Sequence, residues 1–167
     1  NDKLRLTTLY FNRKEKNFVF FDGANSRYLN SPNKIDAQGV EIELDWKPME
    51  RIRLNSNYAF TERKGDNAIR IPKHKINAIL GYEFNKRTFT SLSYSYTGQR
   101  FDTDFTVFSD VRLDPYSRVD FYISHKIFPG RFKVFFNLQN LFNEDYVEII
   151  GFTTRGRNVR VGATLTL

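Results

Sequence analysis

One polar stretch of the chain, residues 101–114, concentrates side chains suited to holding a ligand. It contains Phe101, Asp102, Asp104, Phe105, Phe108, Asp110 and Asp114. Carboxylate oxygens suit Ca²⁺, but the glycine and terminal glutamate of an EF-hand loop are missing, so the aspartates predict a solvated loop. The phenylalanines are more informative, because aromatic side chains exposed on a loop favour contact with a ligand or a protein. The candidate ligand contacts of this stretch are Phe101, Asp102, Asp104, Phe105 and Phe108.

A second cluster of polar and aromatic residues lies nearer the end of the sequence. Its members are Asn140, Leu141, Phe142, Asn143, Tyr146, Gly156 and Arg157. Asparagine side chains near a strand end can satisfy backbone groups, and a glycine permits a tight turn. We therefore interpret the cluster mainly as the frame of a loop. Candidate ligand contacts in that loop are Tyr146, Arg155 and Arg157.

The residue types needed for catalysis or for a resident metal are not arranged to work together. His74 and His125 lie on different predicted strands and have no partner at a metal-ligand spacing. The chain has no cysteine, so it has neither disulfide bonds nor thiolate ligands. The segment "GRNVRVG" lacks the Gly-Lys-[Ser/Thr] sequence and the following helix of a phosphate-binding loop. The sequence predicts a protein that is not an enzyme and holds no cofactor or metal.

The segments that must position these residues show apolar side chains at every second position. In "VEIELDW", for example, the apolar residues from Val40 to Trp46 share one face and the carboxylates share the other. A period of two is typical of a β-strand with one apolar face. It predicts eight strands, at about 1–11, 40–46, 51–60, 75–84, 90–99, 118–127, 131–140 and 158–167. Helical periodicity is weak, so the expected fold class is all-β.

The connections between these strands alternate in length. Tight turns fall at 47–50, 85–87 and 129–130, and long polar loops fall at about 22–34, 62–70, 101–114 and 146–156. Short turns at one end and long loops at the other predict an antiparallel up-and-down sheet. A transmembrane β-barrel of the outer-membrane type has this asymmetry, with its turns in the periplasm and its loops outside the cell.

The polar face of the predicted sheet carries opposite charges on neighbouring strands. Across the 47–50 turn, Glu43 and Asp45 are expected near Arg51 and Arg53. A soluble sandwich buries its apolar face, whereas a membrane barrel turns that face to lipid and lines its lumen with polar residues. The long strands, and the aromatics at the ends of the apolar rows, favour the barrel. The expected lumen wall comprises Glu41, Glu43, Asp45, Arg51, Arg53, Asn55 and Asn57.

Length and charge limit the possible partners. The chain has 167 residues, which is enough for one domain. Its 26 Lys and Arg residues exceed its 19 Asp and Glu residues, giving a formal net charge of +7. A basic surface favours an anionic partner, such as lipopolysaccharide or an acidic ligand.

Three motifs resemble the C-terminal part of TonB-dependent outer-membrane receptors. "NLFNEDY", then "GFTTRGR" and a last strand, resembles that family's Asn-Leu-Phe-[Asn/Asp]-x-x-Tyr cluster, Gly-Arg pair and closing strand. "NKIDAQGVEIELDWKP" resembles its Gly-[Val/Ile]-Glu strand, and "RIPKHKINAILGYEF" resembles its Pro-x-His strand. The motifs span residues 33–167, and the pattern is most similar to receptors for cobalamin and siderophores.

The resemblance implies that residues 1–167 are the C-terminal part of a plugged, 22-stranded barrel in the bacterial outer membrane. It implies uptake of a scarce nutrient, such as cobalamin or a ferric siderophore, with the TonB energy-coupling complex acting through the plug. The plug and the earlier strands would lie on the same chain or on a separate one. Other expected partners are outer-membrane lipid, including lipopolysaccharide, and a surface lipoprotein. Nucleic acid is not expected.

Two other interpretations fit the strand pattern. Eight strands can close by themselves into a small outer-membrane barrel with an adhesion or structural role. A soluble β-domain that combines basic and aromatic residues could bind nucleic acid. The cluster at 140–146 argues against the first interpretation, and the long two-faced strands argue against the second.

Overall fold

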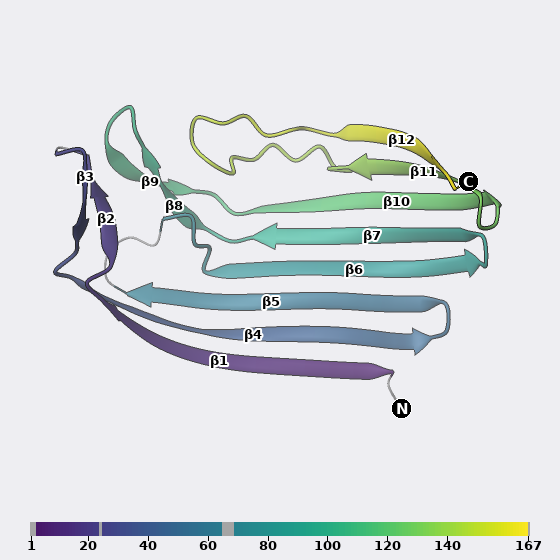
Figure 1. Cartoon of the computed structure of the whole chain (residues 1–167), viewed down its shortest axis with the longest axis horizontal. Coiled ribbons are helices and arrows are strands. Elements are labelled where there is room, and N and C mark those ends of the chain that lie inside the picture. Colours follow the sequence, from purple (N-terminus) through teal and green to yellow (C-terminus); the bar gives the residue numbers. More distant parts are fainter. Residues whose placement is uncertain (1–2, 24, 65–68, 167) are drawn as a thin grey trace.

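The computed structural model describes residues 3–23, 25–64 and 69–166. Eight strands form one antiparallel sheet, and its spatial order follows the chain (Figure 1). They are β1 (Leu4–Lys16), β4 (Lys34–Met49), β5 (Ile52–Lys64), β6 (His74–Asn85), β7 (Thr88–Thr97), β10 (Tyr116–Phe128), β11 (Phe132–Gln139) and β12 (Asn158–Leu165). The predicted all-β, up-and-down architecture is confirmed. No helix in the described ranges is long and apolar enough to cross a membrane.

Two small hairpins rise from the long connections. One pairs β2 (Val19–Asp22) with β3 (Arg27–Asn30), and the other pairs β8 (Arg100–Asp104) with β9 (Ser109–Leu113). Both lie at the same end of the sheet, opposite the tight turns (Figure 1). The sequence predicted plain loops here, so these hairpins are additional structure. We call this end the loop end and the other the turn end.

The register aligns the apolar residues across the whole sheet. One continuous row of directly paired residues runs through all eight strands: Leu4, Trp46, Leu54, Leu80, Leu92, Phe121, Leu138 and Val159. A shift of one residue in any pair would move a whole strand's apolar set to the other face. The register therefore gives the sheet one apolar face, as predicted; the final residue of the predicted last strand, Leu167, lies outside the described residues.

Directly paired residues of the opposite parity form the polar face. One such row is Thr7, Glu43, Asn57, Asn77, Ser95 and Arg118. The apolar face has no second layer packed on it in the described structure: Leu6 is 63% exposed and Val161 is 75% exposed. Only Ile35, Ala37 and Leu113 are buried apolar residues in the described ranges. A sheet that leaves a continuous apolar face uncovered requires an apolar surrounding, and lipid supplies one.

The sheet is open, with β1 and β12 as its two edges. In the described residues these strands do not pair with each other, so the eight strands do not close on themselves. This arrangement disfavours the alternative of a self-contained eight-stranded barrel, in which the first and last strands must pair.

Glycines on the polar face lie beneath phenyl rings of neighbouring strands. A Cβ atom added to Gly39 would meet the Phe11 ring and the backbone oxygen of Phe60, and one added to Gly162 would meet the Phe135 ring. A Cβ atom added to Gly81 would lie 3.1 Å from the Phe89 ring. Rings that cover strand glycines in this way shield the backbone and help fix the register.

Candidate functional site

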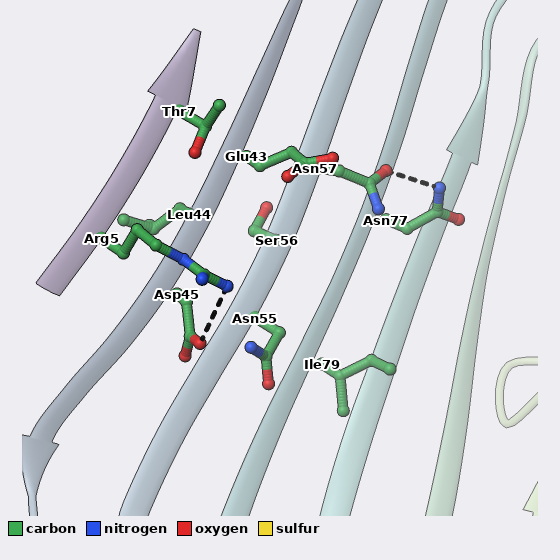
Figure 2. A pocket seen from close by; sticks show the side chains of 10 residues that line it. All are labelled: Arg5, Thr7, Glu43, Leu44, Asp45, Asn55, Ser56, Asn57, Asn77 and Ile79. Atoms are coloured by element: carbon green, nitrogen blue, oxygen red, sulfur yellow. Dashed lines mark hydrogen bonds and ion pairs between the residues drawn. The ribbon is translucent and has the colours of Figure 1, made fainter.

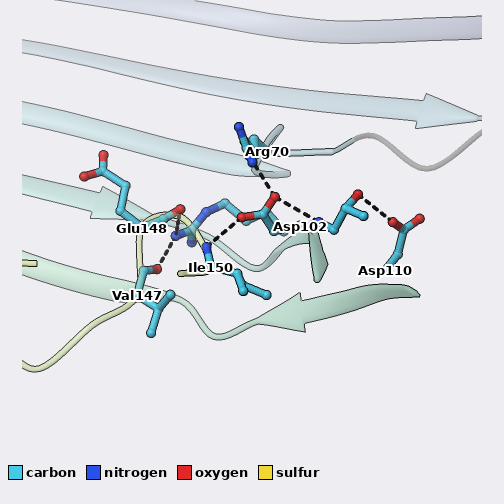
Figure 3. A network of polar contacts seen from close by, with 8 residues as sticks. Arg70, Asp102, Asp110, Val147, Glu148 and Ile150 are labelled. Carbon is cyan, nitrogen blue, oxygen red and sulfur yellow. Dashed lines mark hydrogen bonds and ion pairs between the residues drawn. The ribbon is translucent and has the colours of Figure 1, made fainter. Parts of the chain in front are cut away.

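At the loop end, the Asp102 carboxylate joins three separate segments of the chain (Figure 3). It is fully buried, and its Oδ1 atom accepts hydrogen bonds from the Arg70 guanidinium at 2.8 Å and from the Thr103 amide at 2.9 Å. Its Oδ2 atom accepts from the Ile150 amide at 2.9 Å. Asp102 lies on β8, Arg70 precedes β6 and Ile150 lies in the loop 140–157. The side chain therefore attaches the β8–β9 hairpin to its neighbours.

These hydrogen bonds determine the ionisation of Asp102. Burial by itself would raise the pKa of the carboxyl group, because a low-dielectric environment disfavours the charged form. The bonds from the Ile150 amide, Arg70 and the Thr103 amide outweigh that effect, and the pKa is lowered from its ordinary value of 3.8. Asp102 is therefore a carboxylate at neutral pH. The prediction of a solvated ligand contact does not describe its surroundings.

Arg100, two residues earlier on β8, reinforces the same attachment. The side chain is 5% exposed, and its Nη2 atom donates to the carbonyl oxygens of Val147 at 2.5 Å and Glu148 at 3.2 Å. Its guanidinium carbon lies 5.2 Å from the centre of the Tyr116 ring. Figure 3 shows Val147, Glu148 and Ile150 of this loop, with Ile150 bonded to Asp102. Arg100 and Asp102 thus anchor the loop 140–157 from one strand.

Asn140 begins that loop and organises its first turn. The residue is 1% exposed and adopts a left-handed backbone conformation, with φ of 52°. Its Nδ2 atom donates to the Glu144 carbonyl at 2.9 Å, and its Oδ1 atom accepts from the Glu144 amide at 2.8 Å. Its own amide donates to Asp120 at 2.8 Å. These contacts support the interpretation of Asn140 as part of the loop's frame.

Asn143 connects the two ends of the same loop. It also has a positive φ, of 56°, and its Oδ1 atom accepts from the Arg157 amide at 2.8 Å. A Cβ atom at Gly156 would lie 2.9 Å from that oxygen. Close approach of the Asn143 side chain, rather than the expected tight turn, therefore explains the glycine. The two motif residues between the asparagines have different surroundings. The Leu141 amide donates to the Val119 carbonyl, whereas the Phe142 side chain is 72% exposed.

Tyr146 forms one wall of an open cavity on the loop end. Its ring stacks on Tyr116, with 4.3 Å between centroids, and its hydroxyl accepts from Arg118 at 3.2 Å. The cavity has a volume of about 330 Å³, and Arg112 and Asp145 are among its other lining residues. Of the residues predicted to contact a ligand, Tyr146 is the one that lines a cavity here. The stacked aromatic pair offers a flat surface to a planar group, and the lining carries both signs of charge, Arg112 with Asp114 and Asp145.

The tip of the β8–β9 hairpin is apolar and exposed. Phe105 is 66% exposed and Phe108 is 83% exposed, whereas Phe101 is 39% exposed. Asp104 accepts hydrogen bonds from the amide and the hydroxyl of Thr106, which lower its pKa and fix the turn. The two other predicted contacts, Arg155 and Arg157, are exposed in the loop 140–157. The structure places these residues at one end without joining them into one pocket.

The polar face carries a charged group where β1, β4 and β5 meet (Figure 2). Arg53 forms a two-pronged contact with Asp45, with distances of 3.2 and 3.3 Å, and Arg5 approaches the same carboxylate at 3.8 Å. Asn57 accepts from Asn77 at 2.9 Å. A cavity of about 210 Å³ lies between these side chains.

The predicted charge pairing on this face holds for one pair. Asp45 binds Arg53, but Arg51 instead donates to the Phe84 carbonyl at 3.4 Å, and Glu43 has no ion pair among the described residues. Glu43 lies opposite Asn57, Asp45 opposite Asn55, and Glu41 opposite Ala59. A register shift between Trp46 and Met49 moves the arginines relative to the carboxylates.

Sequence reasoning missed an aromatic row on the polar face. Phe89, Tyr122 and Phe135 follow one another across β7, β10 and β11, with centroids 6.3 and 6.1 Å apart. Gly81 and Gly162 lie at its two ends. The alternation of residue types could have revealed this row, because each of these aromatics falls at a position that alternates with the apolar residues of its strand.

The two histidines have local partners. His74 shares a hydrogen bond of 2.9 Å with the Tyr58 hydroxyl, and His125 shares one of 2.9 Å with the Thr88 hydroxyl. Within the described residues, no group of three or more His, Cys, Asp or Glu side chains could hold a metal ion.

Comparison with known proteins agrees with this geometry. A family model for the TonB dependent receptor-like β-barrel matches residues 1–141. The metal-pseudopaline receptor CntO of Pseudomonas aeruginosa (strain UCBPP-PA14) is 24% identical over 159 residues. That match covers 87% of this chain but only 22% of the relative.

Solved receptors share the fold. The ferric-catecholate import receptor Fiu of E. coli K12, in its closed form, superposes with a TM-score of 0.78 and 18% identity, over 99% of this chain and 25% of that one. The pyoverdine receptor FpvA of Pseudomonas aeruginosa PAO1, bound to pyoverdine, gives a TM-score of 0.80 and 16% identity, over 99% of this chain and 27% of that one. The chain thus spans about a quarter of these receptors. With its family match over residues 1–141, its apolar outer face and its long-loop end, the chain belongs to the TonB-dependent receptors, as a part of their β-barrel in the bacterial outer membrane.

Proposed function

We propose that residues 1–167 form the C-terminal part of the barrel of a receptor that takes up a ferric siderophore or a similar metal chelate. The family match over residues 1–141 carries this proposal. The named relatives favour a metal chelate over cobalamin, because CntO is called a metal-pseudopaline receptor and FpvA was solved with pyoverdine bound. The remaining strands and the plug would complete a barrel of about 22 strands, the size of plugged outer-membrane transporters.

The loop end and the polar face of the sheet would have different roles. The loop end would meet the chelate first, with the exposed Phe105 and Phe108 and the basic Arg155 and Arg157 in contact range. Aromatic rings suit the planar groups of a chelator, and guanidinium groups suit its anionic oxygens. Asp102 would act indirectly, because it is buried and bonded to the protein's own groups.

The polar face would line the lumen and face the plug. Its proposed wall is Glu41, Glu43, Asp45, Arg51, Arg53, Asn55 and Asn57. Partly exposed charges and amides can exchange protein partners for water, so such a wall can release a plug segment when the TonB complex pulls on it. The energy-coupling step itself would occur through the plug.

A growth experiment tests the proposed function. The gene that encodes the complete receptor would be deleted, and growth would be measured under iron limitation with single ferric siderophores, and separately with limiting cobalamin. We expect loss of growth on at least one metal chelate, the same loss in a strain without TonB, and normal growth with cobalamin. Loss of growth on cobalamin alone would contradict the choice of substrate class.

The hairpin tip provides a local test of the binding role. The double substitution Phe105→Ser and Phe108→Ser should weaken binding of the transported chelate by about tenfold, because two exposed rings lose their contact area. Titration of the detergent-purified receptor, followed by intrinsic fluorescence, would measure the affinity. Phe128→Ser is the matched control, because Phe128 is similarly exposed, at 63%, but lies at the turn end. Equal affinities for the double variant and the wild type would exclude the hairpin tip from the binding site.

A further inference from the structure

On the polar face, the row of aromatic rings lies directly beside a row of lysines near the turn end. The rings of Phe89, Tyr122 and Phe135 follow one another with centroids 6.3 and 6.1 Å apart. Two residues from Phe135 toward the β10–β11 turn, Lys133 lies directly opposite Lys126. Successive residues on one face of a strand are about 7 Å apart. One ligand can therefore contact the rings and the lysines together.

A cavity of about 210 Å³ opens beside these lysines, at the turn between β10 and β11. Its polar lining consists of Lys126, Arg131, Lys133, Thr164 and Thr166. No carboxylate of the described residues lines it. Three basic side chains and two hydroxyl groups are donors of hydrogen bonds, so the cavity suits an anion.

The basic residues of this cavity have no charged partner within the described part of the chain. Lys126, Arg131 and Lys133 make no ion pair there. Like charges placed directly opposite each other on two strands repel, as Lys126 and Lys133 must. An anion in the cavity would remove this repulsion.

Carboxylates of the polar face lie elsewhere in the sheet. Residues 121–143 and 149–167 contain no Asp or Glu. Glu83 is on β6, opposite Phe89, and β6 is two strands away from β10. Glu43 and Asp45 are on β4, still farther across the sheet. An anion beside this face would therefore be drawn to the turn end of β10, β11 and β12.

The position of the cavity limits the source of the anion. The polar face would line the lumen, so membrane lipid would not reach it, and the turn end would open toward the periplasm. The neighbouring rings favour an anion that also carries a flat aromatic group, because such a group can stack on them. Phe89 is 37% exposed, which leaves part of its ring available for contact.

We propose that the aromatic row and the basic cavity together form a turn-end site for an anionic aromatic metal chelate. An aryl ring of the chelate would stack on Phe89, Tyr122 or Phe135, and its negative charge would lie among Lys126, Arg131 and Lys133. The inference rests on the proposed function. It adds a second contact at the opposite end of the sheet from the loops, which the cargo would reach as it leaves the lumen.

Quenching of a fluorophore beside the cavity tests the site in the complete receptor, purified in detergent. Thr166→Cys, in a background without other cysteines, would carry the fluorophore, because Thr166 lines the cavity. The anionic ferric complex of catechol should quench it saturably. The double variant K126Q/K133Q should bind this complex about tenfold more weakly, since two charge contacts are lost. K126R/K133R keeps both charges and should restore the affinity.

Two kinds of control isolate the position and the chemistry. K16Q/K34Q also removes two directly opposed lysines, but from the loop end of β1 and β4, and should bind like the wild type. Ferric citrate is anionic but has no ring, so it should bind more weakly than the catechol complex. The neutral ferric complex of acetohydroxamate has neither ring nor net charge, and it should quench without saturation.

Four results would each overturn the turn-end site. They are the absence of quenching by the catechol complex, as expected if the plug covers the cavity, wild-type affinity in K126Q/K133Q, an equal loss in K16Q/K34Q, and equal quenching by all three complexes. A receptor that supports chelate-dependent growth without saturable quenching would lack this site but keep the proposed function. A receptor that supports growth on no metal chelate would refute the proposed function itself.

Discussion

At the scale of the residue, Asp102 is the side chain with the clearest predicted effect. Asp102→Asn keeps the size of the side chain but replaces one acceptor oxygen with a donor, so either the Arg70 or the Ile150 contact is lost. A lost partner of a buried group costs about 1–3 kcal/mol. We expect faster hydrogen exchange at Ile150 and in the β8–β9 hairpin, and unchanged exchange in β4 and β5. Unchanged exchange at Ile150 would show that the carboxylate does not hold the loop.

The same carboxylate predicts how the loop responds to acid. Its pKa in the folded protein lies below the ordinary value of 3.8, so its contribution to stability is present above that value. The contribution is lost as the pH falls through the lowered pKa. The attachment of the loop should therefore persist at neutral and mildly acidic pH, and exchange at Ile150 should rise only below about pH 3.8.

Gly156 offers a second test at this scale. In Gly156→Ala the new methyl group would meet the Asn143 Oδ1 atom at 2.9 Å and displace it from the Arg157 amide. The loop should lose about 1 kcal/mol of local stability, seen as faster limited proteolysis within 140–157. Gly23→Ala is the control, because a Cβ atom there has no neighbour within 4 Å. Equal proteolysis of the two variants would contradict the proposed role of Asn143.

Residue roles at the loop end could be predicted only in part. The contacts of Asn140 and Asn143 with backbone groups of their own loop could be predicted, because asparagine side chains near a strand end bond to backbone groups close in sequence. Asp102 does not, because its burial depends on Ile150, which lies 48 residues away. The sequence shows an aspartate in a polar loop, and only the fold shows that the loop covers it.

At the scale of the element, the two hairpins should differ in stability. The β8–β9 hairpin is attached through Arg100 and Asp102, which are buried, and through Leu113, which is 7% exposed. Every described residue of β2 and β3 is exposed or half-buried. Hydrogen exchange should therefore be slower in β8 and β9 than in β2 and β3. The reverse order would mean that buried side chains do not control the stability of these hairpins.

The eight long strands and their two faces were predictable, because a period of two over about ten residues is a strong signal. The hairpins were not, since each of their strands has only four or five residues and mixed polarity. The predicted pairing of Glu43 and Asp45 with Arg51 and Arg53 was only partly correct, also because the sequence pattern lacks the deciding signal. A bulge between Trp46 and Met49 leaves no trace in the alternation of residue types.

At the scale of the whole molecule, the two open edges determine how this segment behaves by itself. β1 and β12 each present unpaired backbone groups, which template association with other strands. Residues 1–167 expressed alone in detergent should therefore form multimers, whereas the complete receptor should run as a heat-modifiable monomer. Gel mobility before and after heating distinguishes the two. A heat-modifiable monomer of 19.8 kDa would support the small self-closed barrel instead.

The glycines beneath the phenyl rings have a consequence for the width of the bore. In the proposed lumen wall, each of these rings covers a glycine, which has no side chain to hold the ring away from the sheet. At Gly81 and Gly162 the methyl group of an alanine would meet the ring, and at Gly39 it would also meet the carbonyl oxygen of Phe60. A larger residue at Gly81 or Gly162 would therefore narrow the proposed bore at that place, because the ring would have to move away from the sheet.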